Sequence, residues 1–415
     1  MQPLSIAIAG CGISGLALAL LLHRQGHAVK IYERFCVPKP VGSGLMLQPT
    51  GMAVLAELGL AERVLAQGAP VTGLLGLNRE GEPVLEAAYA DMPQANVFGL
   101  GIQRADLFGT LYENVLAASI PIETGFAVSH FAEQAAGAMV IDEQGRRSTS
   151  HDLVVDALGL HSPLVPPADA MLPYGALWAN VELPEDDTFR HDLLEQRYER
   201  ALRMVGVLPV GQGRAAFFWS LRSDEHAAWR AGGMACWWDE VEALWPQCGV
   251  FRAQLCEAEQ LVFARYAHRS SPQSESVRLI HLGDAWHAAS PQLGQGANMA
   301  LLDAYALAQA LAAAPTLVGA KSEFLRLRQW HVRLYQALTW AFTPPFQSAA
   351  AWPAALRDLV LAPASRMVPG PRMKAHLVAG LAGNPLARLG LAMPDYSALA
   401  VASSTASRAS ALAQS

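Results

Sequence analysis

The sequence predicts an α/β protein, and three observations lead to that class. A short apolar strand at residues 6–9 runs into a GxGxxG glycine pattern and then an apolar helix. A second apolar strand ends at Glu33, about 30 residues into the chain, which is the spacing of a βαβ nucleotide-binding unit. Far along the chain, residues 278–303 are again an apolar strand, an acidic turn and a glycine-rich helix start. Two such segments predict one discontinuous Rossmann-like domain wrapped around one cofactor.

Each glycine of the first pattern has a physical role. Gly10 permits the tight turn, Gly12 lets a phosphate approach the backbone, and Gly15 lets the helix pack closely on the strand. Glu33 is placed to bind the hydroxyls of a ribose. The pattern alone is weak evidence, because an ordinary βαβ unit can contain incidental glycines. Strand, helix and acidic residue in the expected order favour a nucleotide site.

Composition limits the classes of function. The chain has 415 residues, of which 52% are hydrophobic and 16% charged, so it can bury a large core and form two closely joined domains. A net charge of -6 gives no electrostatic reason to bind nucleic acid. The five cysteines form no CxxC pair, which indicates reduced thiols, a cytoplasmic protein and no metal site. Neither a signal peptide nor a bilayer-spanning apolar run is expected.

A second sheet is predicted outside the nucleotide-binding segments. Apolar stretches at 74–77 and 84–89 flank a turn, and further strands are expected at 176–183, 204–210, 215–221 and 261–267. Gly211-Gln-Gly213 is expected to be a hairpin turn rather than a second nucleotide loop, because no helix follows it. Trp219 and Phe217 are candidates for contact with a planar apolar substrate, although packing in the core is the alternative role.

Five motifs along the first three quarters of the chain carry one resemblance. They are Gly10-x-Gly12-x-x-Gly15, Glu33-Arg34, Gln103-Arg104-Ala-Asp-Leu107, Asp156-Ala-Leu-Gly159-x-x-Ser162, and Gly283-Asp284-x-x-His287-x-x-x-Pro291-x-x-Gly294-Gln295-Gly296-x-Asn298. In this combination the chain resembles the class A flavoprotein monooxygenases, the para-hydroxybenzoate hydroxylase superfamily. The last motif is long and specific, whereas the first is common to many flavoproteins.

The resemblance implies FAD as the cofactor and a discontinuous FAD-binding domain of the glutathione-reductase type. Asp284 would hold a ribityl hydroxyl, and Arg104 would contact the FAD phosphates or the ribityl chain. The helix that opens after Gly294 would direct its free amides at the flavin, which favours negative charge on the reduced ring. The expected FAD contacts are Gly10, Gly12, Ile13, Ser14, Gly15, Glu33, Arg34, Gly44, Arg104, Asp156, Gly159, Asp284, Gly294, Gln295, Gly296, Ala297 and Asn298.

The same resemblance implies a reaction. NAD(P)H would reduce the flavin, O2 would add to its C4a carbon, and the resulting hydroperoxide would transfer one oxygen atom to an aromatic or otherwise electron-rich apolar molecule. Pro291 and Gly294 would shape the wall beside the reactive carbon, and Pro291 would also contact the substrate. No spacing identifies a catalytic base. His287 is expected to be a structural hydrogen-bonding residue rather than a proton shuttle.

One motif departs from the family pattern and leaves alternatives open. Most members have Asp-Gly-x-x-Ser, whereas this chain has Leu158 before Gly159 and an aspartate, Asp156, two positions earlier. The change either preserves the turn or weakens direct reduction by NAD(P)H, in which case a separate flavin reductase would be a partner. A flavin-binding protein without catalysis, acting in a biosynthetic complex, is another alternative. A halogenase is disfavoured, because the chain has no WxWxIP segment and no lysine between Lys39 and Lys321.

The chain is expected to divide into three parts. These are an FAD-binding domain at 1–72, 96–170 and 272–320, a substrate domain at 73–95 and 171–271, and a C-terminal helical region at 321–400. Phe324, Leu327 and His331 recur at helical spacing, which predicts a helix that clamps the domains in preference to a membrane surface. The apolar run that ends at Leu361 loosely resembles the tails of family members that hydroxylate lipophilic quinone precursors. The segment 401–415 is expected to be disordered.

Overall fold

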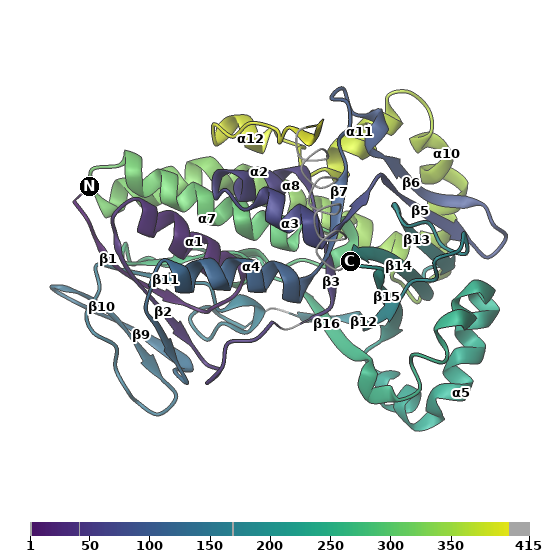
Figure 1. Ribbon diagram of the computed structural model, residues 1–415, viewed down its shortest axis with the longest axis horizontal. Coiled ribbons are helices and arrows are strands. Elements are labelled where there is room, and N and C mark those ends of the chain that lie inside the picture. Colours follow the sequence, from purple (N-terminus) through teal and green to yellow (C-terminus); the bar gives the residue numbers. More distant parts are fainter. Residues whose placement is uncertain (1, 41, 168–169, 398–415) are drawn as a thin grey trace, which may run out of the picture.

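Two sheets with flanking helices make up the fold, as Figure 1 shows. The computed structural model describes residues 2–40, 42–167 and 170–397, so the tail expected at 401–415 lies outside the described residues. The α/β class predicted from the sequence is confirmed. None of the helices within the described ranges has the length and apolar character needed to cross a membrane.

A five-stranded parallel sheet, in the order β17-β11-β1-β2-β8, forms the cofactor side of the molecule. Ile8 of β1 pairs with Ile31 on one side and with Val155 on the other. The carboxyl ends of parallel strands lie at one edge, which is where ligands of such sheets bind. The strands are β1 (Ser5–Ala9), β2 (Ala28–Glu33), β8 (Ile122–Thr124), β11 (Leu153–Asp156) and β17 (Leu279–His281).

Apolar layers cover both faces of this parallel sheet. Three helices pack on one face, where Ile6 and Ile8 are fully buried. An antiparallel hairpin covers the other face and contributes Val128 and Val140 to a smaller apolar cluster. Burial on both faces explains why these strands are almost continuously apolar. The helices are α1 (Ile13–Arg24), α4 (Arg104–Ala117) and α7 (Gly296–Ala313), and the hairpin strands are β9 (Val128–Gln134) and β10 (Gly137–Asp142).

The second sheet has seven strands in the order β16-β12-β15-β14-β13-β5-β6. The six predicted strands and the predicted hairpin turn at 211–213 are confirmed. Strand β13 and helix α5 (His226–Leu244), which covers one face of this sheet, were not predicted. The strands are β5 (Gly73–Asn78), β6 (Pro83–Ala88), β12 (Ala170–Glu182), β13 (Leu193–Glu199), β14 (Arg203–Gly211), β15 (Arg214–Arg222) and β16 (Val262–His268).

A small three-stranded sheet, in the order β3-β7-β4, connects the two large sheets. A Cβ atom on Gly44 of β3 would lie 2.6 Å from the Cβ atom of Ala216 in β15. Glycine at this position therefore allows β3 to approach the second sheet. The elements of this connection are β3 (Gly44–Leu47), β4 (Ala69–Val71), β7 (Gly99–Gln103), α2 (Pro49–Glu57) and α3 (Ala61–Gln67).

The C-terminal region is helical, as predicted. Its long helix α8 packs on α7 and buries Phe324 and Leu327 in the core of the cofactor side. The far end of α8 buries Phe346 against the second sheet, so one helix contacts both parts of the molecule. The helices are α8 (Leu317–Phe346), α9 (Ala351–Leu356), the π-helical turn η6 (Arg357–Leu361), α10 (Ala362–Ser365), α11 (Gly370–Val378) and α12 (Pro385–Arg388).

A fully buried carboxylate, Asp303 of α7, ties the acidic turn after β17 to the C-terminal helices. Its Oδ2 lies 2.9 Å from the amide of Gly283 and 2.6 Å from Nε2 of His287, and its Oδ1 accepts from Nε of Arg328 at 2.7 Å. Arg328 continues the network to His331, whose Nε2 lies 3.1 Å from the carbonyl of Gly380. The structural role expected for His287 is the one observed.

The charges of this network are mutually dependent. Burial raises the pKa of Asp303, but attraction to His287 and Arg328 outweighs burial and lowers the pKa to about 2. Burial and the charge of Arg328 lower the pKa of His331 well below its ordinary value, so this ring is neutral. A buried ion pair is tolerated only while both partners are present.

The Asp303→Asn substitution should reduce the free energy of unfolding at neutral pH by roughly 3–5 kcal/mol, because Arg328 remains buried without a counter-charge. Since the folded protein lowers the pKa of Asp303 from 3.8 to about 2, the stabilisation is complete above pH 3.8 and is lost as the pH falls toward 2. Urea unfolding at several pH values measures both effects. Glu323→Gln, which removes an exposed partner of Arg326 on α8, should change little. Equal stability of Asp303→Asn and the parent protein would contradict the role of the network.

Candidate cofactor site

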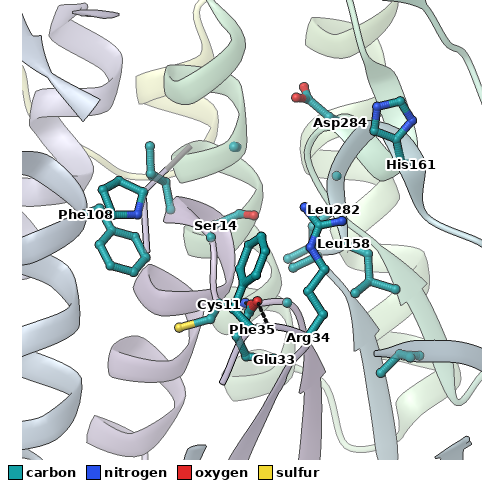
Figure 2. Close-up of a pocket in the computed structure, with 18 of the residues that line it drawn as sticks. Cys11, Ser14, Glu33, Arg34, Phe35, Phe108, Leu158, His161, Leu282 and Asp284 are labelled. Atoms are coloured by element: carbon teal, nitrogen blue, oxygen red, sulfur yellow. Dashed lines mark hydrogen bonds between the residues drawn. The ribbon is translucent and has the colours of Figure 1, made fainter. Parts of the chain in front are cut away.

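A cavity of ≈ 390 Å³ opens at the carboxyl ends of the parallel strands (Figure 2). Its lining comes from the turn after β1, the end of β2, the loop after β11, the turn after β17 and the starts of α4 and α7. The cavity therefore brings together motifs that lie far apart in the chain. The sequence-predicted residues that line it are Gly10, Gly12, Ile13, Ser14, Glu33, Arg34, Arg104, Gly159, Asp284, Gly296 and Ala297.

The glycine turn between β1 and α1 forms the floor of the cavity. Gly10 has a positive φ of 109°, and a Cβ atom there would lie 2.5 Å from the carbonyl oxygen of Ala157. A Cβ atom on Gly12 would meet no atom within 4 Å, so this position faces open space. The first turn of α1 has no side-chain cap, which leaves backbone amides free to bind an anion. Gly15 lies outside the cavity lining and, as expected, permits close packing, because a Cβ atom would be 2.1 Å from the carbonyl oxygen of Gly10.

The carboxylate of Glu33 is held at the end of β2 by backbone amides. Its two oxygens accept from the amide of Cys11 at 2.9 Å and from the amide of Phe35 at 3.0 Å, and the side chain is 8% exposed. A carboxylate accepting one bond on each oxygen has lone pairs left for the hydroxyls of a ribose. Burial and the charge of Glu33 raise the pKa of the Cys11 thiol to about 12, so Cys11 is a neutral lining group rather than a nucleophile.

Arg104 and Asp284 supply opposite charges to the same cavity. Arg104 is the first residue of α4, and Asp284 is the first residue of α6 (Asp284–His287). Burial lowers the pKa of Arg104, while the charge of Asp284 opposes that shift. No direct ion pair joins the two side chains in the described ranges. Both therefore retain hydrogen-bonding capacity for a ligand, and the set fits FAD, with amides and Arg104 for phosphates and Asp284 for a hydroxyl.

The glycine-rich turn before α7 is held in place by two side chains that do not line the cavity. Asn298 is fully buried: its Oδ1 accepts from the amide of Gln48 at 2.8 Å, and its Nδ2 donates to the carbonyls of Met46 and Gly294. Gln295 donates to the carbonyl of Val378 at 2.7 Å. The side chains of Gln295 and Asn298, expected to contact FAD, thus position the turn. Of residues 291–298, only Gly296 and Ala297 reach the cavity, and neither Gly294 nor Pro291 belongs to its lining.

Asp156, expected to contact FAD directly, is fully buried and does not belong to the cavity lining. Its Oδ2 accepts from Oγ of Ser162 at 2.7 Å and lies 2.8 Å from Nδ1 of His281, and its Oδ1 accepts from the amide of Leu158. The carboxylate is fully buried and shapes the turn after β11. Leu158 and Gly159 of this turn line the cavity. The departure from the family motif therefore retains an acidic residue that organises the loop.

Several lining residues were not found from the sequence. Phe108 lies four residues after Arg104 on α4, so helical spacing could have indicated that both face the cavity. In Figure 2, Phe108 and the pair Asp284 and His161 lie on opposite sides of Ser14. His161 and Phe35 come from loops, and no local pattern points to them.

The two aromatic residues expected at the substrate lie on the face of the second sheet that α5 covers. Phe217 and Trp219 of β15 are buried against α5, with ring centroids 6.0 Å and 6.4 Å from that of Trp237. Side chains alternate along a strand, so Phe218 points to the opposite face. That face is the one that contacts β3, where Gly44, another expected FAD contact, packs on Ala216 outside the cavity. The structure thus places Phe217 and Trp219 among core side chains, on the face of β15 opposite Gly44.

The Gly12→Val substitution should weaken FAD binding by at least ~100-fold, because the new side chain occupies the space that a phosphate needs beside the α1 amides. The fold should persist, since a Cβ atom there meets nothing within 4 Å. Flavin absorbance per protein and the thermal midpoint of the flavin-free protein measure the two effects separately. Gly109→Val on α4, another glycine whose Cβ atom would meet nothing, is the matched control and should keep its flavin. A Gly12→Val protein that remains fully yellow would exclude this turn from the cofactor site.

Comparison with known proteins agrees with this geometry. A family model described as an FAD binding domain matches residues 4–325. The chain is 28% identical over 346 residues to an aurachin C monooxygenase/isomerase of Stigmatella aurantiaca, covering 78% of this chain and 85% of that protein. It is also 28% identical over 340 residues to a 3-amino-4-hydroxybenzoate 2-monooxygenase of Streptomyces cremeus, covering 78% of this chain and 82% of that protein.

The fold also matches a solved flavoprotein. The structure of Klebsiella pneumoniae HpxO complexed with FAD and uric acid superimposes with a TM-score of 0.74 over 92% of this chain and 98% of that chain, at 21% identity. Because the FAD-binding family model covers most of the chain and the described cavity presents groups that fit FAD, the chain belongs to the class A flavoprotein monooxygenases and is an FAD-dependent monooxygenase.

Proposed function

We propose that this monooxygenase inserts one oxygen atom from O2 into an uncharged, apolar aromatic molecule and takes its electrons from NAD(P)H. The observation that carries the proposal is an apolar cluster on the face of the second sheet opposite α5. We call it the substrate-face cluster. Its large members are Met46, Trp178, Tyr198, Met204, Phe218 and Phe346.

The substrate-face cluster is one strand away from the cofactor loop. Met46 of β3 belongs to the cluster, and its carbonyl accepts from Asn298, which also holds the carbonyl of Gly294. The ring centroids of Trp178 and Phe218 are 4.6 Å apart. Flat aromatic side chains next to the turn that is expected to face the flavin favour a planar apolar substrate.

The phenol and indole groups of this region are neutral. The Tyr198 hydroxyl donates to Gln196 at 2.9 Å, and Nε1 of Trp178 donates to the Tyr266 hydroxyl at 2.9 Å. Burial raises the pKa of both Tyr198 and Tyr266 above the ordinary range, so the two phenols stay protonated at neutral pH. Groups of this kind can orient a hydroxyl, carbonyl or ring nitrogen of a substrate. The buried guanidinium of Arg357 beside Tyr198 already pairs with Asp358 and donates to backbone carbonyls, so its charge is compensated within the protein.

The residues of the chain have separate tasks in the proposed reaction. FAD, when bound, supplies the electrons and the activation of oxygen. The start of α7 lacks a side-chain cap, so its free amides would stabilise negative charge at the cofactor. The substrate-face cluster would exclude water and hold the aromatic ring, with Pro291 proposed as part of the same wall. No side chain is assigned as a catalytic base.

A separate reductase is the second candidate for electron supply, because Leu158 stands where most family members have aspartate, and Leu158 lines the cavity. Anaerobic stopped-flow reduction of the yellow protein by NADH and by NADPH, with and without a panel of phenols, quinolones and polycyclic aromatics, distinguishes the two. Bleaching accelerated by an uncharged aromatic compound is the expected result. If dithionite bleaches the flavin but neither NADH nor NADPH does, an external reductase supplies the electrons. If no compound of the panel stimulates oxygen consumption by the reduced protein, the proposed oxygen insertion is wrong.

The Phe218→Ala substitution should weaken binding of an aromatic substrate by about tenfold, because it removes ring contact from the substrate-face cluster. Phe217→Ala is the matched control from the opposite face of the same strand. It should cost about 3–5 kcal/mol of stability through the cavity it leaves and should not change substrate affinity. Perturbation of the flavin spectrum during substrate titration measures the affinities. If Phe217→Ala weakens substrate binding and Phe218→Ala does not, the substrate binds on the α5 face.

A further inference from the structure

Exposed apolar side chains are concentrated in the C-terminal region. Eight large apolar side chains between residues 352 and 373 are at least 40% exposed, and Val368 reaches 91%. Exposure of so many large apolar side chains within one short segment is typical of a surface that contacts something other than water. The eight residues are Trp352, Leu356, Leu359, Val360, Leu361, Met367, Val368 and Met373.

These side chains belong to a folded unit, which we call the apolar cap and define as residues 351–378. It consists of α9, η6, α10 and α11, which pack on one another and on β6 at the edge of the second sheet (Figure 1). Arg366 donates to the carbonyl of Pro83 in β6, and Nζ of Lys374 lies 3.3 Å from Oγ of Ser365. The exposed side chains are thus presented by secondary structure attached to the sheet edge.

The charge of the apolar cap is opposite to that of the whole chain. The cap has four basic residues, Arg357, Arg366, Arg372 and Lys374, and one acidic residue, Asp358, whereas the chain has 30 basic and 36 acidic residues. Asp358 is already paired with Nε of Arg357 at 2.6 Å. A partner for this surface must therefore be apolar and negatively charged. A second copy of the cap would bring the same positive charges together, which disfavours a symmetric dimer contact.

The apolar cap is joined directly to the substrate-face cluster. Arg357 is only 1% exposed, and its guanidinium carbon lies 5.1 Å from the ring centroid of Tyr198 and 5.2 Å from that of Phe346. Its Nη1 donates to the carbonyls of Arg200 and Pro345 at 3.0 Å. A binding partner on the apolar cap would therefore lie next to the substrate-face cluster, which is proposed to hold the substrate.

We propose that the apolar cap docks on the surface of an anionic lipid bilayer. Trp352, Leu359 and Val368 would enter the boundary between headgroups and acyl chains, while Arg366 and Arg372 would lie at the lipid phosphates. The helix predicted from the sequence to clamp the domains rather than to contact a membrane is α8. The apolar cap follows α8 in the chain. If the proposed function holds, docking brings the substrate-face cluster close to apolar aromatic molecules dissolved in the bilayer.

Vesicle flotation of the full-length, FAD-loaded protein tests the docking without any substrate, so its outcome is independent of the proposed reaction. The parent protein should float with phosphatidylcholine vesicles that contain phosphatidylglycerol and much less with pure phosphatidylcholine. The double substitution Leu359→Glu and Val368→Glu should lower the bound fraction by at least ~10-fold while flavin content and thermal midpoint stay unchanged. Arg372→Gln should lower partitioning onto the anionic vesicles about fivefold.

Leu116→Glu, at an apolar residue of α4 that is 51% exposed, is the matched control and should float as the parent does. A parent protein that stays in the soluble fraction with both kinds of vesicle overturns the proposal. Sedimentation in the absence of lipid gives the remaining test: if the parent is a dimer that the double substitution converts to monomers, the cap is a contact between copies of this chain and the proposal is wrong.

Discussion

The buried carboxylate of Asp303 is the constraint on which the remaining structure depends. It joins the amide of Gly283, the imidazole of His287 and the guanidinium of Arg328, and so connects the turn after β17, helix α7 and helix α8. A charge without access to water is stable only with such partners. The network fixes the position of α7, whose first residues line the cofactor cavity, and through His331 it reaches the turn at Gly380.

The cofactor cavity is shaped largely by backbone, and this explains the character of its motifs. Glycines at 10 and 12 are needed because a side chain would clash with Ala157 or fill the space beside the α1 amides. The polar side chains of the motifs divide into two groups. Glu33, Arg104 and Asp284 line the cavity. Asp156 and Asn298 instead form hydrogen bonds that hold the neighbouring loops in place. A motif residue can thus be essential to the cofactor without touching it.

Strand β3 is one place where the cofactor side of the molecule and the second sheet approach closely. Gly44 lets β3 pack on β15, and Asn298 holds the adjacent carbonyl of Met46. Strand β3 therefore contacts the turn before α7 on one side and the substrate-face cluster on the other. If the substrate-face cluster holds the substrate, as proposed, β3 separates it from the turn before α7, and exclusion of water there would favour controlled transfer of an oxygen atom.

Local patterns in the sequence predicted the β1–α1–β2 unit, the strand before Asp284 and the lining role of Glu33, because strand length, helix period and turn chemistry are encoded by neighbouring residues. The lining role of Arg104 was implied by the resemblance to the family. The same patterns could not orient β15: Phe217, Phe218 and Trp219 are all apolar, so no alternation distinguishes its two faces. Nor could these patterns distinguish motif residues that line the cavity from those that hold its loops in place.

The sequence by itself determined the α/β class and the cofactor motifs. Only the tertiary structure decided which aromatic face lies beside β3 and which residues of the C-terminal region stay exposed, because both depend on packing between segments that are distant in the chain.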